Sequence, residues 1–352
     1  MDYRKEIDEL VDLIIKEGAS DLHLSSGRTP IIRVSGSLIP LVKKPVIKEQ
    51  DMQGFIDVFL IPAEKEFLAK EKDVDFSYNL THARFRGHIY FRQGVPSIAL
   101  RLIPKSIRTL AELNLPPILE SFTRKSQGFF IVVGPIGQGK TTTLASMIEM
   151  INQSRTEHIL TIEDPIEYMY ESKKSIIDQR EVRIDTPDFA NALTAMFRED
   201  IDVCLVGEMR DASTMATAVT AAETGHLVFS TLHTNNASQT IDRIIDSFPA
   251  NQQDQIRVQL AGSLSGIFSQ RLIPRISGGM IPAYELLINN NAVANLIRER
   301  RTHEINTVIE TSSEQGMIDM NRSLAELVRA GEISVENAYL YSMNPKSLER
   351  LV

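Results

Sequence analysis

A glycine-rich segment near the middle of the chain has the residue types that hold phosphate groups. Residues 134–142 read GPIGQGKTT and satisfy the pattern GxxxxGK[ST] after an apolar run. Glycines at these places let backbone N–H groups turn toward phosphate oxygens at the start of a helix. Lys140 is predicted to bridge the β- and γ-phosphates, and Thr141 is predicted to be a ligand of Mg²⁺. The predicted nucleotide-binding residues are Gly134, Pro135, Ile136, Gly137, Gln138, Gly139, Lys140, Thr141 and Thr142.

Two glutamates, each at the end of a short apolar segment, are predicted to complete this phosphate site. Glu163 ends the segment ILTIE, and we expect it to orient and polarise the attacking water. Glu208 follows VCLVG, which has the shape of a Walker B segment with Gly207 in place of the common aspartate. We expect Glu208 to support the Mg²⁺ ion through a water molecule. Ligands bind where the strands of open α/β sheets end, although an acidic residue at such a place can instead cap a helix.

A histidine and an arginine-bearing strand could supply further contacts with the nucleotide. His233 follows a fourth apolar segment at residues 227–230, and we predict that it donates a hydrogen bond to the γ-phosphate or senses its loss. Alternation over residues 84–92 places Arg86 opposite the apolar side chains, and Arg101 has the same relation to its neighbours. These arginines either belong to a solvated sheet face or reach a nucleotide held by the other domain or by a neighbouring subunit.

The patterns before the phosphate loop predict a smaller α+β domain over residues 1–104. Helical patterns occupy residues 5–16 and 49–70. A mostly antiparallel sheet is predicted from two strands joined by a turn at 35–37 within residues 30–41, and from strands at about 74–80, 84–92 and 97–103. Residues 105–118, which include a pair of prolines, are predicted to be the linker.

Residues 119–352 are predicted to form a wound α/β domain around the phosphate site. Short apolar segments without alternation predict parallel strands buried on both faces, at residues 129–133, 159–162, 203–206 and 227–230. Helical patterns at 141–150 and 212–223 lie between them and complete βα units. The chain after about Gln252 is expected to be helical.

Composition limits the classes of function open to the chain. Its 352 residues carry 38 basic and 46 acidic side chains, and the net charge of −8 disfavours a bulk electrostatic grip on nucleic acid or anionic lipid. Cys204 is the single cysteine, which excludes internal disulfides and multi-cysteine zinc sites. The apolar segments are shorter than the roughly 20 residues that cross a bilayer, and no signal-peptide pattern opens the chain. We therefore expect a cytoplasmic protein without stable nucleic-acid binding.

Together these segments resemble the secretion ATPase superfamily over nearly the whole chain, and within it the type IV pilus retraction ATPases (the PilT family). Besides the phosphate loop, the resemblance rests on ASDLHLS at 19–25, TIEDPIEY at 161–168, QREV at 179–182, GEMRD at 207–211 and GHLVFSTLHT at 225–234. It implies an α/β fold with a RecA-like P-loop ATPase core and a smaller PAS-like N-terminal domain. It also implies ATP and Mg²⁺ as cofactors.

The resemblance assigns roles to particular residues. It implies that Glu163 activates the water and that Glu208 supports Mg²⁺. It also implies that Arg86, Arg101 and Arg198 contact the nucleotide, some of them across subunits.

The function that the resemblance implies is that of an ATP-hydrolysing motor for pilus retraction. Such a motor depolymerises pilin into the membrane and so drives twitching motility. The family implies a homo-oligomer, a hexameric ring, that delivers work to a platform protein in the inner membrane. The chain is therefore expected in the cytoplasm at the inner face of the plasma membrane, in peripheral association with it through the pilus machine.

Departures from the family leave alternatives open. The segment AVANLIRE at 292–299 resembles the family's Ala-Ile-Arg-Asn-Leu-Ile-Arg-Glu but has Ala294 where arginine is usual, and Ile136 and Gln138 replace the usual threonine and serine. An accessory retraction paralogue is therefore an alternative to the main motor. A type II secretion or pilus assembly ATPase is opposed by the missing four-cysteine metal site. A RecA-like nucleic-acid motor is opposed by the acidic charge balance, and a nucleotide-gated module without turnover by the complete phosphate site.

Overall fold

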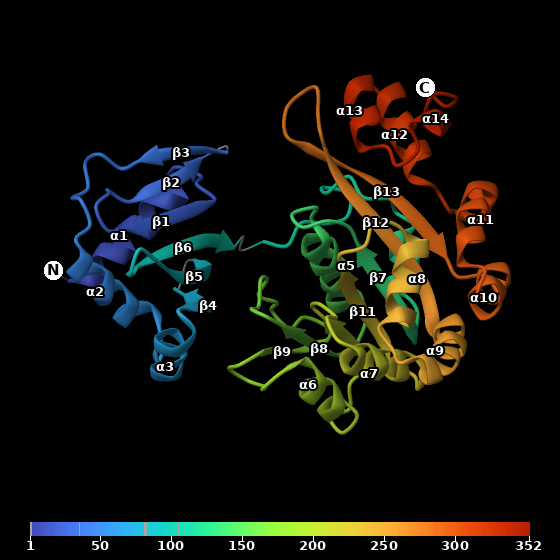
Figure 1. Cartoon of the computed structure of the whole chain (residues 1–352), viewed down its shortest axis with the longest axis horizontal. Helices are drawn as coiled ribbons and strands as arrows, with labels where there is room; N and C mark the ends of the chain where they lie inside the picture. Colours follow the sequence, from blue (N-terminus) through green and yellow to red (C-terminus); the bar gives the residue numbers. More distant parts are fainter. Residues whose placement is uncertain (1, 35, 81–82, 104–105) are drawn as a thin grey trace. The chain divides into compact units, whose positions relative to one another are not determined.

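The computed structural model describes residues 2–34, 36–80, 83–103 and 106–352, and the chain forms two compact units (Figure 1). The N-terminal unit consists of Met1–Ser106 and Pro165–Met169, and the core unit of Ile107–Asp164 and Tyr170–Val352. The short segment Pro165–Met169 thus belongs to the N-terminal unit although the residues on either side of it belong to the core. The predicted domain end at residue 104 and linker start at residue 105 lie outside the described residues.

The N-terminal unit is an antiparallel sheet with helices, as the sequence patterns predicted. Among the described residues its strands follow the order β3-β2-β1-β6-β5-β4, and neighbours are antiparallel. The strands are β1 (Asp21–Ser25), β2 (Ile31–Val34), β3 (Ser37–Pro40), β4 (Asp73–Asn79), β5 (Arg84–Arg92) and β6 (Val95–Ile103). The helices are α1 (Tyr3–Lys16), α2 (Glu49–Phe59) and α3 (Pro62–Glu71). Ile7, Leu10 and Ile14 recur at helical spacing on α1, so one face of this helix enters the core of the unit.

One predicted helix is two helices in the structure. The helical stretch predicted over residues 49–70 is confirmed, but it is divided, because α2 ends at Phe59 and α3 begins at Pro62. Leu60 and Ile61 have extended backbone between the two helices. The residue before a proline is kept out of the helical region by the proline ring. Pro62 then lies in the first turn of α3, where its missing N–H costs no hydrogen bond.

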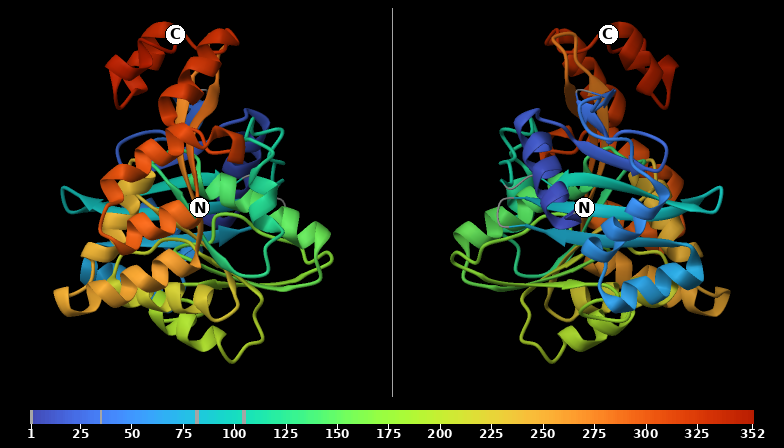
Figure 2. Two further views of the ribbon diagram at one scale, coloured as in Figure 1. Left: turned by 90° about the vertical axis from the view of Figure 1, so that its right-hand side faces the viewer. Right: turned by 90° about the vertical axis from the view of Figure 1, so that its left-hand side faces the viewer.

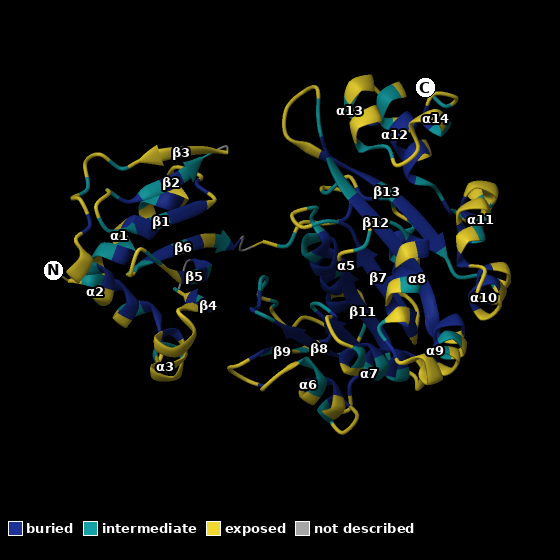
Figure 3. Cartoon of the chain, viewed as in Figure 1, coloured by how far each residue is buried: buried dark blue, intermediate teal, exposed yellow. Residues whose placement is uncertain are grey.

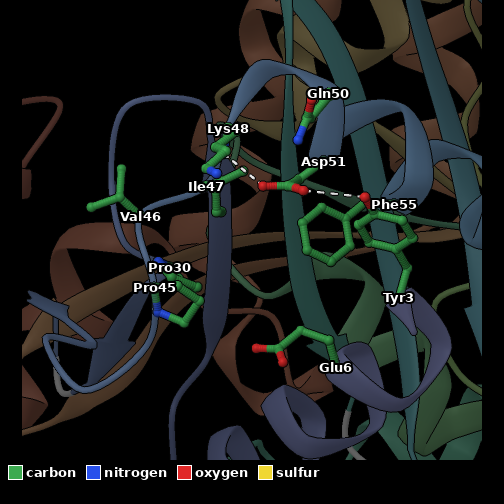
Figure 4. A pocket seen from close by; sticks show the side chains of 10 residues that line it. All are labelled: Tyr3, Glu6, Pro30, Pro45, Val46, Ile47, Lys48, Gln50, Asp51 and Phe55. Carbon is green, nitrogen blue, oxygen red and sulfur yellow. Dashed lines mark hydrogen bonds between the residues drawn. The ribbon is translucent and has the colours of Figure 1, made fainter. Parts of the chain in front are cut away.

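A pocket of about 320 Å³ opens in the N-terminal unit beside α1 and the start of α2 (Figure 4). The carboxylates in its wall are paired. Asp51 accepts hydrogen bonds from the Tyr3 hydroxyl at 3.1 Å and from the Lys48 backbone N–H at 2.8 Å. Glu6 forms an ion pair with Lys44 at 3.0 Å. These contacts join α1 to the segment that starts α2, and we interpret the pocket as a consequence of that packing.

The core unit is a wound α/β sheet, as the continuous apolar segments predicted. Among the described residues the strand order is β13-β12-β7-β11-β10-β8-β9, and every neighbouring pair from β12 to β9 is parallel. The first strands along the chain are β7 (Gly128–Val133), β8 (His158–Glu163), β9 (Ile176–Glu181), β10 (Val203–Val206) and β11 (Leu227–Leu232). The helices among and after them are α4 (Leu119–Thr123), α5 (Lys140–Ser154), α6 (Phe189–Met196), α7 (Ala212–Glu223), α8 (Ala237–Asp246) and α9 (Ala250–Ser263).

Helices cover both faces of this sheet. Phe129 and Ile131 of β7 pack with residues of α6 to α9, whereas Phe130 and Val132 pack with residues of α4 and α5. Figure 3 shows the central strands as buried. Burial on both faces explains why these strands have continuous apolar sequences instead of alternation.

The C-terminal part contains two long strands that the sequence did not predict. The expectation of a helical chain after about Gln252 is wrong for residues 264–288, while the chain on either side of them is mainly helical. After α9 ends at Ser263, β12 (Leu264–Pro274) and β13 (Met280–Ile288) form an antiparallel hairpin. Strand β12 lies between β7 and β13 and is buried over most of its length. It therefore lacks the alternation by which a half-exposed strand is identified.

Short helices follow the hairpin to the C-terminus. They are α10 (Asn291–Arg298), η1 (Thr302–Glu304), α11 (Ile305–Thr311), η2 (Ser313–Gln315), α12 (Met320–Arg329), α13 (Val335–Tyr341) and α14 (Pro345–Leu348). Ile273 and Ile281 of the hairpin form a separate small core with residues of α12, α13 and α14. Figure 2 shows these C-terminal helices beside the end of the hairpin. In the described part of the chain, no helix has both the length and the apolar character needed to cross a membrane.

Candidate nucleotide-binding site

The phosphate loop connects strand β7 to helix α5, which is the context that its motif predicted. Three of its glycines have positive φ angles, of 148° at Gly134, 78° at Gly137 and 81° at Gly139. A Cβ atom at Gly134 would lie 2.4 Å from the backbone oxygen of Gln270, so a side chain there would collide with β12. Glycine therefore lets the loop curl around the N-terminus of α5, where backbone N–H groups can bind phosphate oxygens.

The side chain of Lys140 lies inside this loop, and only 7% of the residue is exposed. Its Nζ donates hydrogen bonds to the backbone oxygens of Gly134, at 2.8 Å, and Pro135, at 2.9 Å. The same nitrogen lies 3.2 Å from Nδ1 of His233. Because an ammonium group can only donate, Nδ1 is the acceptor in this contact. The ammonium group is thus held where a phosphate bound by the loop would meet it.

His233 links Lys140 to Glu208. Its Nε2 lies 3.4 Å from Oε1 of Glu208, so the ring that accepts at Nδ1 carries its proton on Nε2 and turns it toward the carboxylate. Burial lowers the pKa of His233, the positive charge of Lys140 lowers it further, and both favour this neutral form. The structure therefore brings these three predicted site residues together.

Glu163 ends β8 and is buried, with 5% of the residue exposed. Its Oε1 accepts a hydrogen bond from the Thr161 hydroxyl at 2.8 Å. Strand β10 lies beside β8 in the sheet and ends just before Gly207. A Cβ atom at Gly207 would lie 3.2 Å from the backbone oxygen of Ile162. This close approach explains the glycine in the Walker B segment, because the backbone that leads to Glu208 passes directly beside the end of β8.

Four neighbouring strands bring the predicted groups to one edge of the sheet. Strands β7, β11, β10 and β8 are consecutive and parallel, so their carboxyl ends share that edge. The phosphate loop follows β7, His233 follows β11, Glu208 comes after β10, and Glu163 ends β8. Ligands of open α/β sheets bind at such an edge.

The oxygen atoms at this edge suit Mg²⁺ when it arrives with a nucleotide. In the described part of the chain, no group of three or more His, Cys, Asp or Glu side chains could hold a metal ion. A Mg²⁺ ion bound with a nucleotide takes phosphate oxygens and waters besides one or two protein ligands. The Thr141 hydroxyl and the Glu208 carboxylate are oxygen donors of the kind that this ion prefers.

Two of the three arginines predicted to contact the nucleotide, Arg86 and Arg101, have other partners in the structure. Arg86 donates from Nη1 to Oε1 of Glu167 at 3.0 Å, and Arg101 donates from Nε to Oδ1 of Asp21 at 2.9 Å. Both pairs lie within the N-terminal unit. Arg198 is exposed on the core, just after α6. The role of these arginines at a nucleotide stays a prediction.

Arg84 has a structural role that sequence reasoning missed. Arg84 is two residues before Arg86, so alternation gives both the same polar face of β5, but Arg84 is buried and donates from Nε and Nη2 to the backbone oxygen of Ile166, at 3.3 and 3.1 Å. Arg84 and Arg86 together therefore hold the segment Pro165–Met169, which comes directly after Glu163 and Asp164. Alternation could identify their strand face but could not identify a partner so distant in the sequence.

Residues of the β12–β13 hairpin that contact the nucleotide loops were also missed. Gln270 contacts the phosphate loop, and Arg271 donates to Oδ1 of Asn235, beyond His233, at 2.9 Å. Glu285 on β13 is buried and accepts from the backbone N–H of Ala237 at 2.8 Å, and burial raises its pKa to about 7. No signal for these contacts was available, because the two strands were themselves not predicted.

Comparison with known proteins gives consistent matches over both units. The family model of type II/IV secretion system proteins matches residues 3–332. The type IV pilus retraction ATPase PilT of Pseudomonas aeruginosa is 41% identical over 334 residues, which cover 95% of this chain and 97% of that protein. A twitching motility protein of Neisseria gonorrhoeae is 43% identical over 322 residues, 91% of this chain and 86% of that protein. A crystal structure of the pilus retraction motor PilT with bound ADP superposes with a TM-score of 0.90 at 45% identity, over 97% of this chain and 98% of that one.

Proposed function

The chain belongs to the family of type II/IV secretion system proteins, and on that basis we propose that it is an ATP-hydrolysing motor that powers the retraction of type IV pili. One observation carries the proposal: Lys140, His233 and Glu208 form a connected group at the phosphate loop of a chain that resembles pilus retraction ATPases over nearly its full length. Retraction withdraws pilin from the pilus into the membrane, and repeated retraction moves the cell by twitching.

The chemistry follows from the edge of the sheet that holds the phosphate loop. The phosphates bind to backbone N–H groups at the start of α5, and Lys140 exchanges its contacts with loop carbonyls for phosphate oxygens. Glu163 accepts the proton of the attacking water. Thr141 and Glu208 would hold the Mg²⁺ ion, which would supply positive charge to offset that of the phosphates. His233 lies between Lys140 and Glu208, so a change in its ring position reports whether the γ-phosphate is present.

A deletion strain tests this function directly. Loss of the chain should leave cells with pili that do not retract and therefore do not twitch. Complementation with the wild-type chain should restore motility, whereas complementation with Lys140→Ala should not, because phosphate binding is lost. Normal twitching and normal pilus number in the deletion strain would contradict the proposal of a main retraction motor.

An accessory retraction paralogue is the second candidate, and Ala294 favours it. The residue lies on α10 where the family has arginine, and it is buried in the main core of the unit with 7% exposed. A chain that lacks this arginine could assist a main motor instead of replacing it. In that case, pili of the deletion strain would still retract when no load opposes them, but they would generate less force against a load. The chain would also fail to restore retraction in a strain that lacks the main motor.

We further propose that the motor is a homo-oligomeric ring, a hexamer, located in the cytoplasm at the inner face of the plasma membrane. It would deliver its work to the platform protein of the pilus machine. The geometry of Arg101 supports the proposal that catalysis is completed across subunits. Its side chain is 70% exposed, while its Nε is held by Asp21. An arginine positioned in this way can present its outer nitrogens to a phosphate, a contribution worth about 10³–10⁵ in rate for phosphoryl transfer.

Mixed rings test the contribution of the arginines. An Arg86→Ala, Arg101→Ala double variant and a Lys140→Ala variant should each be inactive alone. When they are mixed, some interfaces pair an intact phosphate loop with intact arginines of a neighbour, and part of the ATPase activity should return. Absence of recovery, in rings shown to have exchanged subunits, would mean that these arginines act within their own subunit or only in the sheet.

A further inference from the structure

The phosphate loop is attached to strand β12 by two glutamine side chains. Gln138, inside the loop, accepts a hydrogen bond at Oε1 from the backbone N–H of Leu272 at 2.7 Å. Gln270, on β12, donates from Nε2 to the backbone oxygen of Gln138 at 2.7 Å. The other end of the same amide, Oε1 of Gln270, accepts from the Thr143 hydroxyl on α5 at 2.6 Å. The two side chains therefore bind the loop and the helix that follows it to one strand.

The contact is possible because β12 continues past the end of β7. The register between the two strands ends with Ser269 opposite Val133, where β7 gives way to the phosphate loop. Beyond that point the edge of β12 faces the loop, and its backbone N–H groups need a partner other than a β7 carbonyl. The amide oxygen of Gln138 supplies this partner for Leu272.

Steric contacts hold the same part of the loop against β12. A Cβ atom at Gly134 would lie 2.4 Å from the backbone oxygen of Gln270, and one at Gly139 would lie 2.9 Å from its Nε2. Both ends of the loop thus pack against Gln270, which is 3% exposed. The buried amide of Gln270 is satisfied on both sides, by the Gln138 backbone and by the Thr143 hydroxyl.

We infer that Gln138 and Gln270 are positioning residues that hold the phosphate loop in its nucleotide-binding shape. The serine usual at position 138 in the resembling family is shorter and could not span the distance that the Gln138 side chain spans to β12. A loop already held in its binding conformation loses less conformational freedom when phosphates bind, so it binds them more tightly. The inference rests on the proposed function, since it concerns the site of ATP hydrolysis. It predicts that the pair acts mainly on nucleotide affinity.

Substitutions at position 138 test the inference. Gln138→Ser and Gln138→Met both remove the acceptor for the Leu272 N–H, and methionine keeps the length of the side chain. Loss of one such hydrogen bond should raise the Kd for ADP and the KM for ATP by about fivefold to tenfold, with a smaller change in kcat. Binding of a fluorescent ADP analogue and steady-state phosphate release measure these quantities.

Gln153→Ser is the matched control. Gln153 lies near the far end of α5, about 20 Å along the helix from Lys140, and also makes one side-chain hydrogen bond, to Glu149 at 2.8 Å. Its substitution should leave the Kd for ADP as in the wild type. Thermal unfolding of all variants shows whether they are folded. If Gln138 only stabilised the fold, its substitution would lower the unfolding temperature, and KM would not change more than kcat.

Coupling to Gln270 gives a second, independent measurement. Gln270→Met removes the other half of the attachment. If the two glutamines act together, the Kd for ADP of the Gln138→Ser, Gln270→Met double variant should rise by less than the product of the two single-variant increases. Folded position-138 variants that bind ADP as tightly as the Gln153→Ser control would overturn the inference while leaving ATP hydrolysis by the wild type intact. A wild-type chain that binds no ADP would overturn the proposed function together with the inference.

Discussion

The substitution Glu163→Gln separates the chemical step from nucleotide binding. Glutamine has the shape of glutamate, and its amide oxygen can accept the hydrogen bond that Oε1 now receives from the Thr161 hydroxyl at 2.8 Å. The buried side chain should therefore remain in place, and the free energy of unfolding should change by no more than about 1 kcal/mol. The groups that bind the phosphates, Lys140 and the loop N–H groups, are untouched, so the Kd for ATP should stay within about threefold.

The amide cannot accept the proton of the attacking water, and kcat should fall accordingly. A positioned general base contributes about 10²–10⁴ in rate, which corresponds to about 3–5 kcal/mol of activation free energy. Single-turnover phosphate release, with ATP binding measured separately on the same preparation, provides the assay. Glu157→Gln is the control, since Glu157 pairs with Arg155 away from the phosphate loop. Turnover by Glu163→Gln within threefold of the wild type would refute the assignment and make Glu208 the next candidate for the base.

Three further results are expected. Lys140→Ala should abolish ATP turnover in a folded protein, as measured by phosphate release and circular dichroism, and turnover like that of the wild type would remove the phosphate-loop assignment. Glu208→Gln should raise the Mg²⁺ concentration needed for half-maximal activity, and an unchanged Mg²⁺ titration would place the ion elsewhere. Glu285 has a folded-state pKa of about 7, above its ordinary 4.5, so it stays protonated to a higher pH in the folded state. Its contribution to stability is therefore lost as pH rises from about 4.5 to 7, by up to about 3 kcal/mol. Glu285→Gln should flatten this part of the stability profile in denaturant titrations, and an unchanged profile would contradict the assignment.

The phosphate loop could be predicted because its conformation depends on nearby residues. Gly137 and Gly139 have positive φ angles that glycine adopts without a steric penalty, and the apolar segment and the helix around them are contiguous with the motif. The positions of Glu163 and Glu208 could be predicted for a related reason, since each follows or ends a buried apolar segment and parallel strands bring their carboxyl ends to one edge. Their roles in catalysis stay predictions.

The hairpin β12–β13 could not be predicted, and its contacts with the loops were lost with it. The hydrophobic period of a strand reports burial on one face, and β12 is covered on both faces and also has β7 and β13 as neighbours. In the sequence, therefore, nothing distinguishes Gln270 from other polar residues or indicates its contact with the phosphate loop. Only pairing with β7 places it against the phosphate loop.

The sequence by itself determined the class of chemistry, because a phosphate loop and two strand-end glutamates need little beyond local geometry and a parallel sheet. The tertiary structure alone decided which side chains hold these groups in place. Gln138 reaches Leu272, and Arg84 and Arg86 hold the segment Pro165–Met169 on the N-terminal unit, through contacts between residues far apart in the chain. The physical reason is that a hydrogen bond depends on the positions of two atoms within about 3 Å. A sequence pattern specifies faces and periods, and only the packed chain specifies such positions.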